Sequence, residues 1–315
     1  MSADSQNPIG VLVMAYGTPD SPEDVERYYT HIRRGRAPDP ELLVELQDRY
    51  NAIGGISPLL AITRAQVDGI TAALEQAEPG RFITALGQKH SAPYIEDGVV
   101  ELLDRGVERI VGIVLAPHFS TMSIAQYAAR AEAAAEGRVP VDVVHSWHLE
   151  PGYLELLTGY LGDALAAVGG QDGCEVLFTA HSLPQRILQA GDPYPDQLAE
   201  TAAALAEDAS IDVWSVAWQS AGRTADPWIG PDVLDVVKAR AQAGTRAIVV
   251  CACGFVADHL EVLYDLDIET KALADELGVA FARTASPNAE PEFTAMLAGV
   301  VRAQASLPAS GVAAG

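Results

Sequence analysis

Short apolar runs alternate with longer amphipathic segments along most of the chain. Seven runs rich in Val, Ile, Leu and Ala have the length of β-strands and lie at 10–15, 82–87, 109–115, 141–145, 174–179, 213–218 and 246–253. Their hydrophobicity is continuous rather than alternating, which indicates strands that are covered on both faces. Ten segments of helical character lie between them, at 21–32, 40–52, 61–77, 93–104, 122–136, 151–167, 195–208, 231–243, 258–277 and 289–304. This alternation predicts an α/β fold with right-handed βαβ units and parallel sheets.

Three pairs of segments recur in the same order in the two halves of the chain. They are "VLVMAYGTP" (11–19) with "VLFTAHSLP" (176–184), "APYIEDGV" (92–99) with "DPWIGPDV" (226–233), and "IVGIVLAPHF" (110–119) with "AIVVCACGF" (247–255). Two unrelated Rossmann-like units can converge on such strand chemistry, but the shared order favours a duplication. We therefore predict two Rossmann-like domains, at 9–150 and 151–315, with the last helix able to pack back on the first.

Residues that can carry chemistry gather where the predicted strands end. They are Tyr16, His90, His118, His181 and the segment 254–261. Ligands of open α/β sheets bind outside the carboxyl ends of the strands, so two facing sheets would bring these residues to one cleft. A histidine at a strand end most often bonds a neighbouring carbonyl. Paired with a carboxylate, it becomes a base poised near neutral pH.

The stretch "GFVADHLEVLYDLDIE" (254–269) carries three carboxylates at helical spacing. On a helix, Glu261, Asp265 and Glu269 would lie along one face, where like charges repel. In an acidic protein the ordinary explanation is a solvated acidic face. The alternative is a path for a divalent cation, since carboxylates suit such ions. The apolar residues that flank Glu261 favour a partly buried helix start, and therefore the second explanation.

The charge of the chain narrows the classes of partner. A net charge of −23 over 315 residues disfavours binding to nucleic acid or to anionic lipid, both of which require basic surface. One stretch departs from this, because "RYYTHIRRGR" (27–36) holds four arginines and is followed by Arg49 and Arg64. This basic island requires either an anionic partner or internal carboxylates.

Cysteine use and the length of the apolar runs indicate where the protein works. The three cysteines, Cys174, Cys251 and Cys253, fit a reducing compartment better than a disulfide framework. No apolar run approaches the length of a membrane helix, and the polar start "MSADSQNP" has no basic-plus-apolar leader. We therefore expect a cytoplasmic protein that is not inserted in a membrane.

Nine segments together resemble the ferrochelatase family, and most closely its bacterial coproporphyrin branch. They are "VMAYGTP", "RYYTHIRRGR", "RYNAIGGISPL", "LAPHFST", "AHSLP", "GDPYPDQL", "WQSAG", "DPWIGPDV" and "GFVADHLEVLYDLD". The resemblance runs from residue 11 to about residue 293, and two of the segments, "GDPYPDQL" and "GFVADHLE", are long and specific. The resemblance covers nearly the whole chain.

The resemblance implies a porphyrin cleft between two Rossmann-like domains and insertion of Fe²⁺ into coproporphyrin III. It implies that His181 and Glu261 handle the metal and the protons, with Asp265 and Glu269 as a secondary acidic row. Tyr16 would lie on the opposite face of the macrocycle. The residues implied to hold the substrate's propionates are Arg33, Arg49, Tyr50, Ser57 and Tyr127. The substrate's carboxylates then explain the basic island, since arginine binds carboxylates bidentately.

The resemblance also sets expectations for cofactors, partners and competing functions. Some relatives hold a [2Fe–2S] cluster on four cysteines, which three cysteines cannot supply, so no cofactor beyond the substrate iron is expected. A coproheme decarboxylase could collect the product by transient handover. The alternatives are a protoporphyrin IX ferrochelatase, a chelatase that inserts Co²⁺ or Ni²⁺ into a smaller or more carboxylated tetrapyrrole, and a non-catalytic porphyrin or haem carrier.

Overall fold

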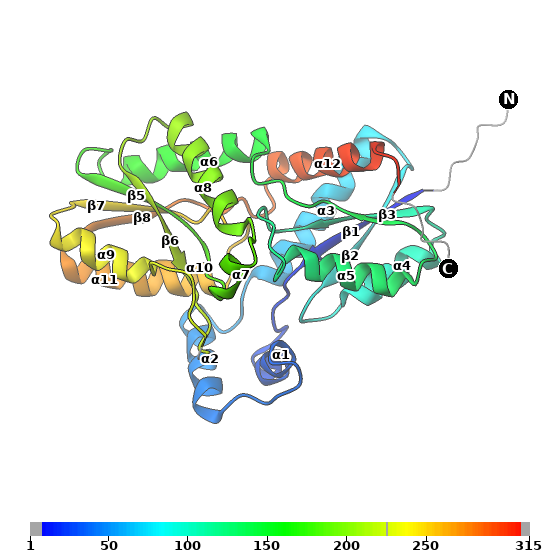
Figure 1. The fold of residues 1–315 in the computed structure, drawn as a ribbon, viewed down its shortest axis with the longest axis horizontal. Helices are drawn as coiled ribbons and strands as arrows, with labels where there is room; N and C mark the ends of the chain where they lie inside the picture. The colour runs from blue at the N-terminus through cyan, green and yellow to red at the C-terminus, as the bar shows by residue number, and fades with distance from the viewer. Residues whose placement is uncertain (1–7, 225, 310–315) are drawn as a thin grey trace.

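The computed structural model describes residues 8–224 and 226–309, and it consists of two α/β halves placed side by side (Figure 1). The first sheet has the order β2-β1-β3-β4, with β1 Ile9–Ala15, β2 Phe82–Gln88, β3 Arg109–Val114 and β4 Val141–Val143. The second has the order β6-β5-β7-β8, with β5 Cys174–His181, β6 Trp214–Gln219, β7 Ala247–Cys251 and β8 Ala280–Arg283. All neighbouring strands are parallel. The predicted α/β class with two parallel sheets is confirmed.

Helices cover both faces of each sheet (Figure 1), so every residue of β1, β3 and β7 is buried. The α-helices are α1 Val25–Ile32, α2 Pro40–Ala52, α3 Leu59–Ala77, α4 Ile95–Asp104, α5 Ile124–Ala135, α6 Pro151–Ala167, α7 Arg186–Gln189, α8 Tyr194–Asp208, α9 Val233–Gln242, α10 Leu260–Val262, α11 Lys271–Leu277 and α12 Pro291–Ser306. A 3₁₀ turn η1 (Pro22–Asp24) and a π-helical segment η2 (Leu263–Thr270) complete the set. Among residues 8–224 and 226–309, no helix combines the length and apolar character needed to span a bilayer.

The strand register supports the internal repeat and corrects one of its pairings. Ala15 at the end of β1 pairs with Gln88 of β2, and Ala180 in β5 pairs with Trp218 of β6. The β1–β2 pair of the first sheet therefore corresponds to the β5–β6 pair of the second. The backbone N–H of Gln88 donates to the carbonyl of Pro93, and that of Trp218 donates to the carbonyl of Pro231. Pro93 therefore corresponds to Pro231 and not to the proline of "DPW", so the predicted pairing of 92–99 with 226–233 is wrong in register.

The last helix lies on the first half of the molecule. α12 packs against α3 and β3 (Figure 1), and a side-chain Cβ on Gly69 of α3 would lie 2.8 Å from the Cβ of Thr294 in α12. Arg109 of β3 donates to the carbonyls of Ala305 and Leu307 at the end of α12. α12 thus ties the end of the chain to the first sheet. The domain bounds 9–150 and 151–315 stay a prediction, and their last residues, 310–315, lie outside the described part.

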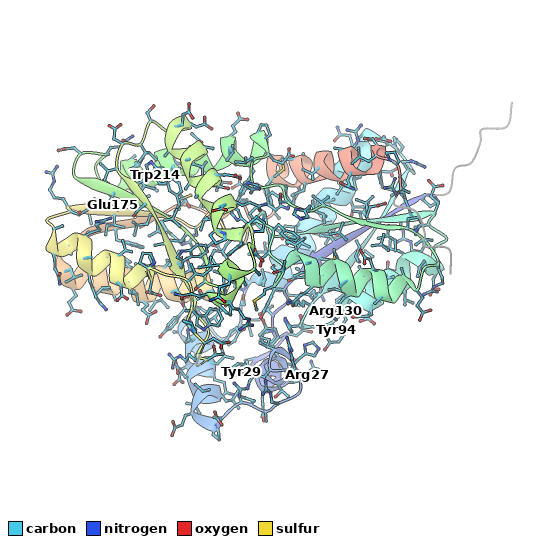
Figure 2. All side chains as sticks on the ribbon, viewed as in Figure 1. Arg27, Tyr29, Tyr94, Arg130, Glu175 and Trp214 are labelled. Atoms are coloured by element: carbon cyan, nitrogen blue, oxygen red, sulfur yellow. The ribbon has the colours of Figure 1, made fainter. Side chains whose placement is uncertain are left out.

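The segment between β1 and β2 that exceeds its counterpart in the second half forms a lobe from α1 and α2. Val25 and Tyr50 of this lobe pack with Leu260 of the second half in one apolar cluster. Figure 2 labels Arg27 and Tyr29 on α1, with Tyr94 and Arg130 on the adjoining edge of the first half. The lobe therefore lies against both halves and carries the basic island to their junction.

Candidate active site

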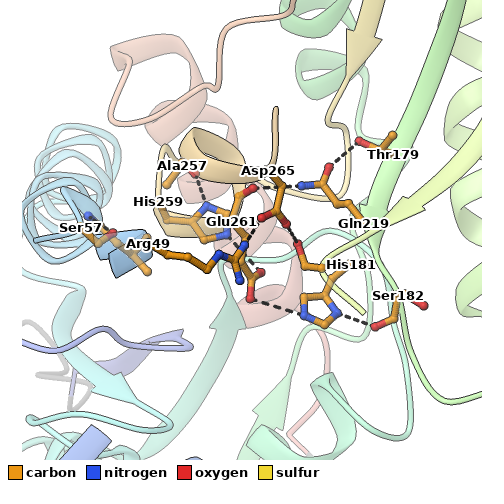
Figure 3. Close-up of polar contacts among 12 residues, drawn as sticks. Arg49, Ser57, Thr179, His181, Ser182, Gln219, Ala257, His259, Glu261 and Asp265 are labelled. Carbon is orange, nitrogen blue, oxygen red and sulfur yellow. Dashed lines mark hydrogen bonds and ion pairs between the residues drawn. The ribbon is translucent and has the colours of Figure 1, made fainter. Parts of the chain in front are cut away.

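His181 ends β5 and presents one ring nitrogen to a carboxylate (Figure 3). Its Nδ1 donates to the carbonyl of Ser182 at 2.5 Å, and its own carbonyl accepts from the Tyr194 hydroxyl at 3.0 Å. Its Nε2 lies 3.5 Å from Oε1 of Glu261. One third of each of these two side chains is exposed. The ring is thus fixed through Nδ1, which leaves Nε2 to meet a proton or a metal.

Glu261 is held by a second histidine and by a glutamine. His259 Nδ1 donates to the carbonyl of Ala257 at 2.9 Å, and its Nε2 lies 3.5 Å from Oε2 of Glu261. The Gln219 amide donates to the backbone carbonyl of Glu261 at 3.2 Å and accepts from the Thr179 hydroxyl at 2.9 Å (Figure 3). Gln219 and Thr179 are buried strand residues of β6 and β5. They connect the start of the acidic helix to the strand that ends in His181.

The two ionisable groups of this pair shift each other's pKa in opposite directions. Burial lowers the pKa of His181, but the nearby Glu261 carboxylate outweighs it and raises the pKa to about 9. Burial raises the pKa of Glu261, but His181 and then His259 outweigh it and hold that pKa well below its usual range. At neutral pH the pair therefore carries a proton on His181. His181 can accept a pyrrole proton only after releasing this one.

The acidic row departs from the predicted regular helix. Residues 263–270 are π-helical, with more residues per turn than an α-helix, and Thr270 Oγ1 donates to the carbonyl of Asp265. Asp265 is buried and accepts from the Arg49 guanidinium and, at 2.5 Å, from the Ser220 hydroxyl. Burial raises the pKa of Asp265 to about 6, with Glu269 and Glu261 adding to the rise against Arg49 and Ser220. Glu269 is exposed, so the row runs from the site to the surface.

Tyr16 directly follows β1 of the first sheet and lies close enough to Glu261 for that carboxylate to affect its pKa. Its side chain is 45 % exposed, and its ring centroid lies 4.6 Å from that of His90. Desolvation within the surrounding walls, and then the charge of Glu261, raise the pKa of Tyr16, so the phenol stays protonated. His90 Nδ1 lies 3.0 Å from Nδ1 of His31 on α1, and burial lowers the pKa of His90 to about 3. Of the five features expected to converge, His181 thus contacts Glu261 of the segment 254–261, and Tyr16 contacts His90, whereas His118 is buried against the Thr201 hydroxyl.

The five residues expected to bind propionates differ in their partners. Tyr50 and Tyr127 are buried, and burial raises the pKa of Tyr50 to about 12. The Ser57 hydroxyl accepts from the backbone N–H of the second residue along, Leu59. Arg33 has no ion pair among residues 8–224 and 226–309, whereas Arg49 is already bound to Asp265. Their contacts with substrate stay a prediction.

A cavity of about 440 Å³ opens beside these groups. Its lining residues come from the loop after Tyr16, from the connection between α2 and α3, from the first turns of α3 and from the residue two after Glu261: Pro19, Asp20, Ile53, Ile56, Ser57, Pro58, Leu60, Ala61, Arg64 and Leu263. Most of these side chains are apolar. The cavity can therefore hold the edge of a large, flat, apolar molecule beside the His181–Glu261 pair.

Several residues of the site were missed from the sequence. Gln219 and Ser220 lay in the quoted segment "WQSAG" without an assigned role, and His259 lay in "GFVADHLE". The position of His259 two residues before Glu261 was the available signal. Conversely, His118 at a predicted strand end is buried 2.9 Å from the Thr201 hydroxyl, as a structural histidine is. Among the described residues, no three His, Cys, Asp or Glu side chains form a group able to hold a metal ion.

A sequence model of the family described as Ferrochelatase matches residues 8–305. The chain belongs to the ferrochelatase family. Among its relatives, the coproporphyrin III ferrochelatase of Bacillus pumilus is 48% identical over 299 residues, which cover 93% of this chain and 96% of that protein. The coproporphyrin III ferrochelatase of Bacillus subtilis is 47% identical over 303 residues, which cover 94% and 98%.

Solved structures of other chelatases share the fold of this family member. The sirohydrochlorin chelatase SirB of Bacillus subtilis subspecies spizizenii, in complex with cobalt, aligns with a TM-score of 0.55 at 12% identity and covers 96% of this chain and 97% of its own. CbiX, the terminal enzyme of sirohaem biosynthesis in denitrifying bacteria, gives a TM-score of 0.56 at 15% identity and covers 95% and 100%. At these identities the likeness concerns the fold alone.

Proposed function

We propose that this chain inserts Fe²⁺ into coproporphyrin III and yields Fe-coproporphyrin and two protons, in a late step of haem biosynthesis. The observation that carries the proposal is the 48% identity, over nearly the full length of both chains, to a coproporphyrin III ferrochelatase. The His181–Glu261 pair beside a largely apolar cavity fits this chemistry. The enzyme would be classed as a lyase.

The reaction requires a metal to exchange its waters for ligands while two pyrrole N–H groups lose their protons. We assign the metal-facing role to His181 Nε2 and Glu261 Oε1, which lie 3.5 Å apart. Glu261 compensates the charge of Fe²⁺, and the imidazole provides a nitrogen donor that suits iron. His181 must give up its own proton as iron or a pyrrole nitrogen approaches. Released protons would then leave along Asp265 to the exposed Glu269.

Binding energy must bend the macrocycle so that pyrrole nitrogens point out of its plane. Propionate contacts remote from the metal can supply it, and we assign these to Arg33, Arg49, Tyr50, Ser57 and Tyr127. Tyr16 would face the metal from the other side. The three buried cysteines leave no set of four thiolates, so we propose no cofactor besides the substrate iron.

The product retains its propionates, and we propose transient handover to a coproheme decarboxylase in the cytoplasm. The net charge of −23 supports a protein that binds neither nucleic acid nor anionic membrane.

Anaerobic absorbance spectroscopy with Fe²⁺ tests the proposed reaction. Coproporphyrin III should lose its four-band free-base spectrum in the presence of the protein, and protoporphyrin IX should change little. Equal or faster insertion into protoporphyrin IX would replace the proposal with a protoporphyrin ferrochelatase. Binding of both porphyrins without insertion would indicate a carrier.

The variant His181→Ala tests the assigned centre. It should abolish insertion and leave porphyrin binding, measured by fluorescence quenching, nearly unchanged. Gln185→Ala, four residues along and outside the metal-facing pair, serves as the control and should retain turnover. Normal turnover in His181→Ala would remove His181 from the mechanism.

A further inference from the structure

Arg64 is a cation in an otherwise mostly apolar cavity. It lies on α3, where Leu60, Ala61 and Arg64 share one helical face, and these three residues line the cavity together with Ser57, which lies two residues before the helix. The side chain is exposed and, among residues 8–224 and 226–309, forms no hydrogen bond or ion pair. Its guanidinium is therefore available to a ligand that occupies the cavity.

The cavity that Arg64 lines lies near the reacting centre. Asp20 lines it four residues after Tyr16, and Leu263 lines it two residues after Glu261. A macrocycle held between Tyr16 and the His181–Glu261 pair would therefore extend one edge into this space. Apolar groups of that edge would contact Ile53 and Ile56, and the polar contacts would come from Ser57 and Arg64.

We propose that Arg64 binds a carboxylate at this edge of the porphyrin and thereby selects a propionate over an uncharged substituent; this inference rests on the proposed function. Guanidinium groups bind carboxylates through a planar fork, which gives both charge and geometric selectivity. A vinyl group at the same place gains nothing from the cation. Arg64 is thus a specificity-determining residue for coproporphyrin against protoporphyrin.

Asp20 acts in the opposite sense. Its carboxylate lines the same cavity and has no ion pair among the described residues. It repels an incoming carboxylate, so the cavity carries one favourable and one unfavourable charge for a propionate. Arg64→Leu and Asp20→Asn should therefore shift coproporphyrin binding in opposite directions, which gives a matched pair of variants.

The experiment measures KM and kcat for Zn²⁺ insertion, with coproporphyrin III and protoporphyrin IX, in the wild type and four variants. Arg64→Leu should raise KM for coproporphyrin about fivefold at low salt, as expected for loss of one exposed ion pair, without changing kcat. KM for protoporphyrin should stay the same. Arg64→Lys should restore part of the loss, Asp20→Asn should lower KM for coproporphyrin, and Arg138→Leu, which lies outside the cavity, should change neither.

An unchanged KM for coproporphyrin in Arg64→Leu, or an equal rise with both porphyrins, would overturn the role of Arg64. Failure of the proposed function is seen separately, as absence of insertion in the wild type. In that event the same five proteins are compared by fluorescence titration with the two metal-free porphyrins. A loss of affinity in Arg64→Leu confined to coproporphyrin supports the inference, and equal affinities refute it.

Discussion

Replacing Glu261 with glutamine should reverse the pKa shift of His181. The Glu261 carboxylate, 3.5 Å from Nε2, raises the pKa of His181 from 6.5 to about 9 against the effect of burial. Without that charge, burial remains, and we expect the pKa to fall to about 6.5 or below. The net rise, after the opposing effect of burial, corresponds to about 3 kcal/mol in favour of the charged ring, and exposure of a third of each side chain reduces this to about 1–2 kcal/mol.

The same shifts predict how stability depends on pH. The pKa of His181 is raised on folding, so its contribution is fully present below pH 6.5 and is lost as the pH rises through 9. The pKa of Glu261 is lowered, so its contribution is present above pH 4.5 and is lost as the pH falls. The pair should therefore stabilise the fold most between pH 4.5 and pH 6.5, and Glu261→Gln should flatten the decline in urea-unfolding stability above pH 6.5 and below pH 4.5.

The assay is NMR titration of ¹⁵N-labelled histidine rings in the metal-free protein. His148, 2.8 Å from Glu200, provides the control, because Glu200→Gln removes a His–Glu pair at another place and should leave the His181 titration unchanged. A His181 pKa near 6.5 in the wild type would refute the reasoning. So would a pKa that stays near 9 in Glu261→Gln.

Three further predictions concern packing, ion pairing and charge. Gly254→Ala should destabilise the fold by about 1–3 kcal/mol in urea unfolding and lower kcat, because the new Cβ would lie 2.3 Å from the Cβ of Ala180, next to His181 at the end of β5. Gly159→Ala is the control: a Cβ there would have no atom within 4 Å, so this variant should not destabilise the fold. Arg109→Met should cost about 3 kcal/mol in the same assay, since it removes a buried ion pair to Asp142, and an unchanged unfolding midpoint would contradict this. KM for coproporphyrin should rise between low salt and about 0.5 M salt, since screening weakens the exposed arginine contacts, and a salt-independent KM would exclude them.

Strand placement was predictable because fully buried parallel strands have a distinct apolar pattern. The runs at 10–15 and 246–253 became β1 and β7, in which every residue is buried. β8 (Ala280–Arg283) was missed, because a four-residue edge strand with one exposed and three half-buried residues has no such pattern. The four-residue helix α7 was missed for a similar reason, since a single turn shows no periodicity.

The carboxylate spacing was a weaker guide than the strand pattern. It identified Glu261, Asp265 and Glu269 as one row, but the regular helix assumed over 258–277 is interrupted by the π-helical segment η2. No residue type marks such a segment in a sequence, and the contacts of its side chains are equally hidden there. Asp265 shows this, as its carboxylate is held by Arg49 and Ser220, which lie far from it in the sequence.

Arg49 illustrates how the structure changes a role inferred from resemblance. The family resemblance implied that Arg49 binds a propionate. In the structure, however, its guanidinium binds Asp265 and lies 4.5 Å from the centre of the Tyr264 ring. A propionate that reaches Arg49 must therefore share or displace the Asp265 carboxylate. Since burial already raises the pKa of Asp265 to about 6, loss of Arg49 would raise it further and favour its protonation. Binding of a propionate to Arg49 on the α1–α2 lobe would then favour protonation of Asp265 in the acidic row. Arg49 would thus couple substrate binding to proton uptake at Asp265.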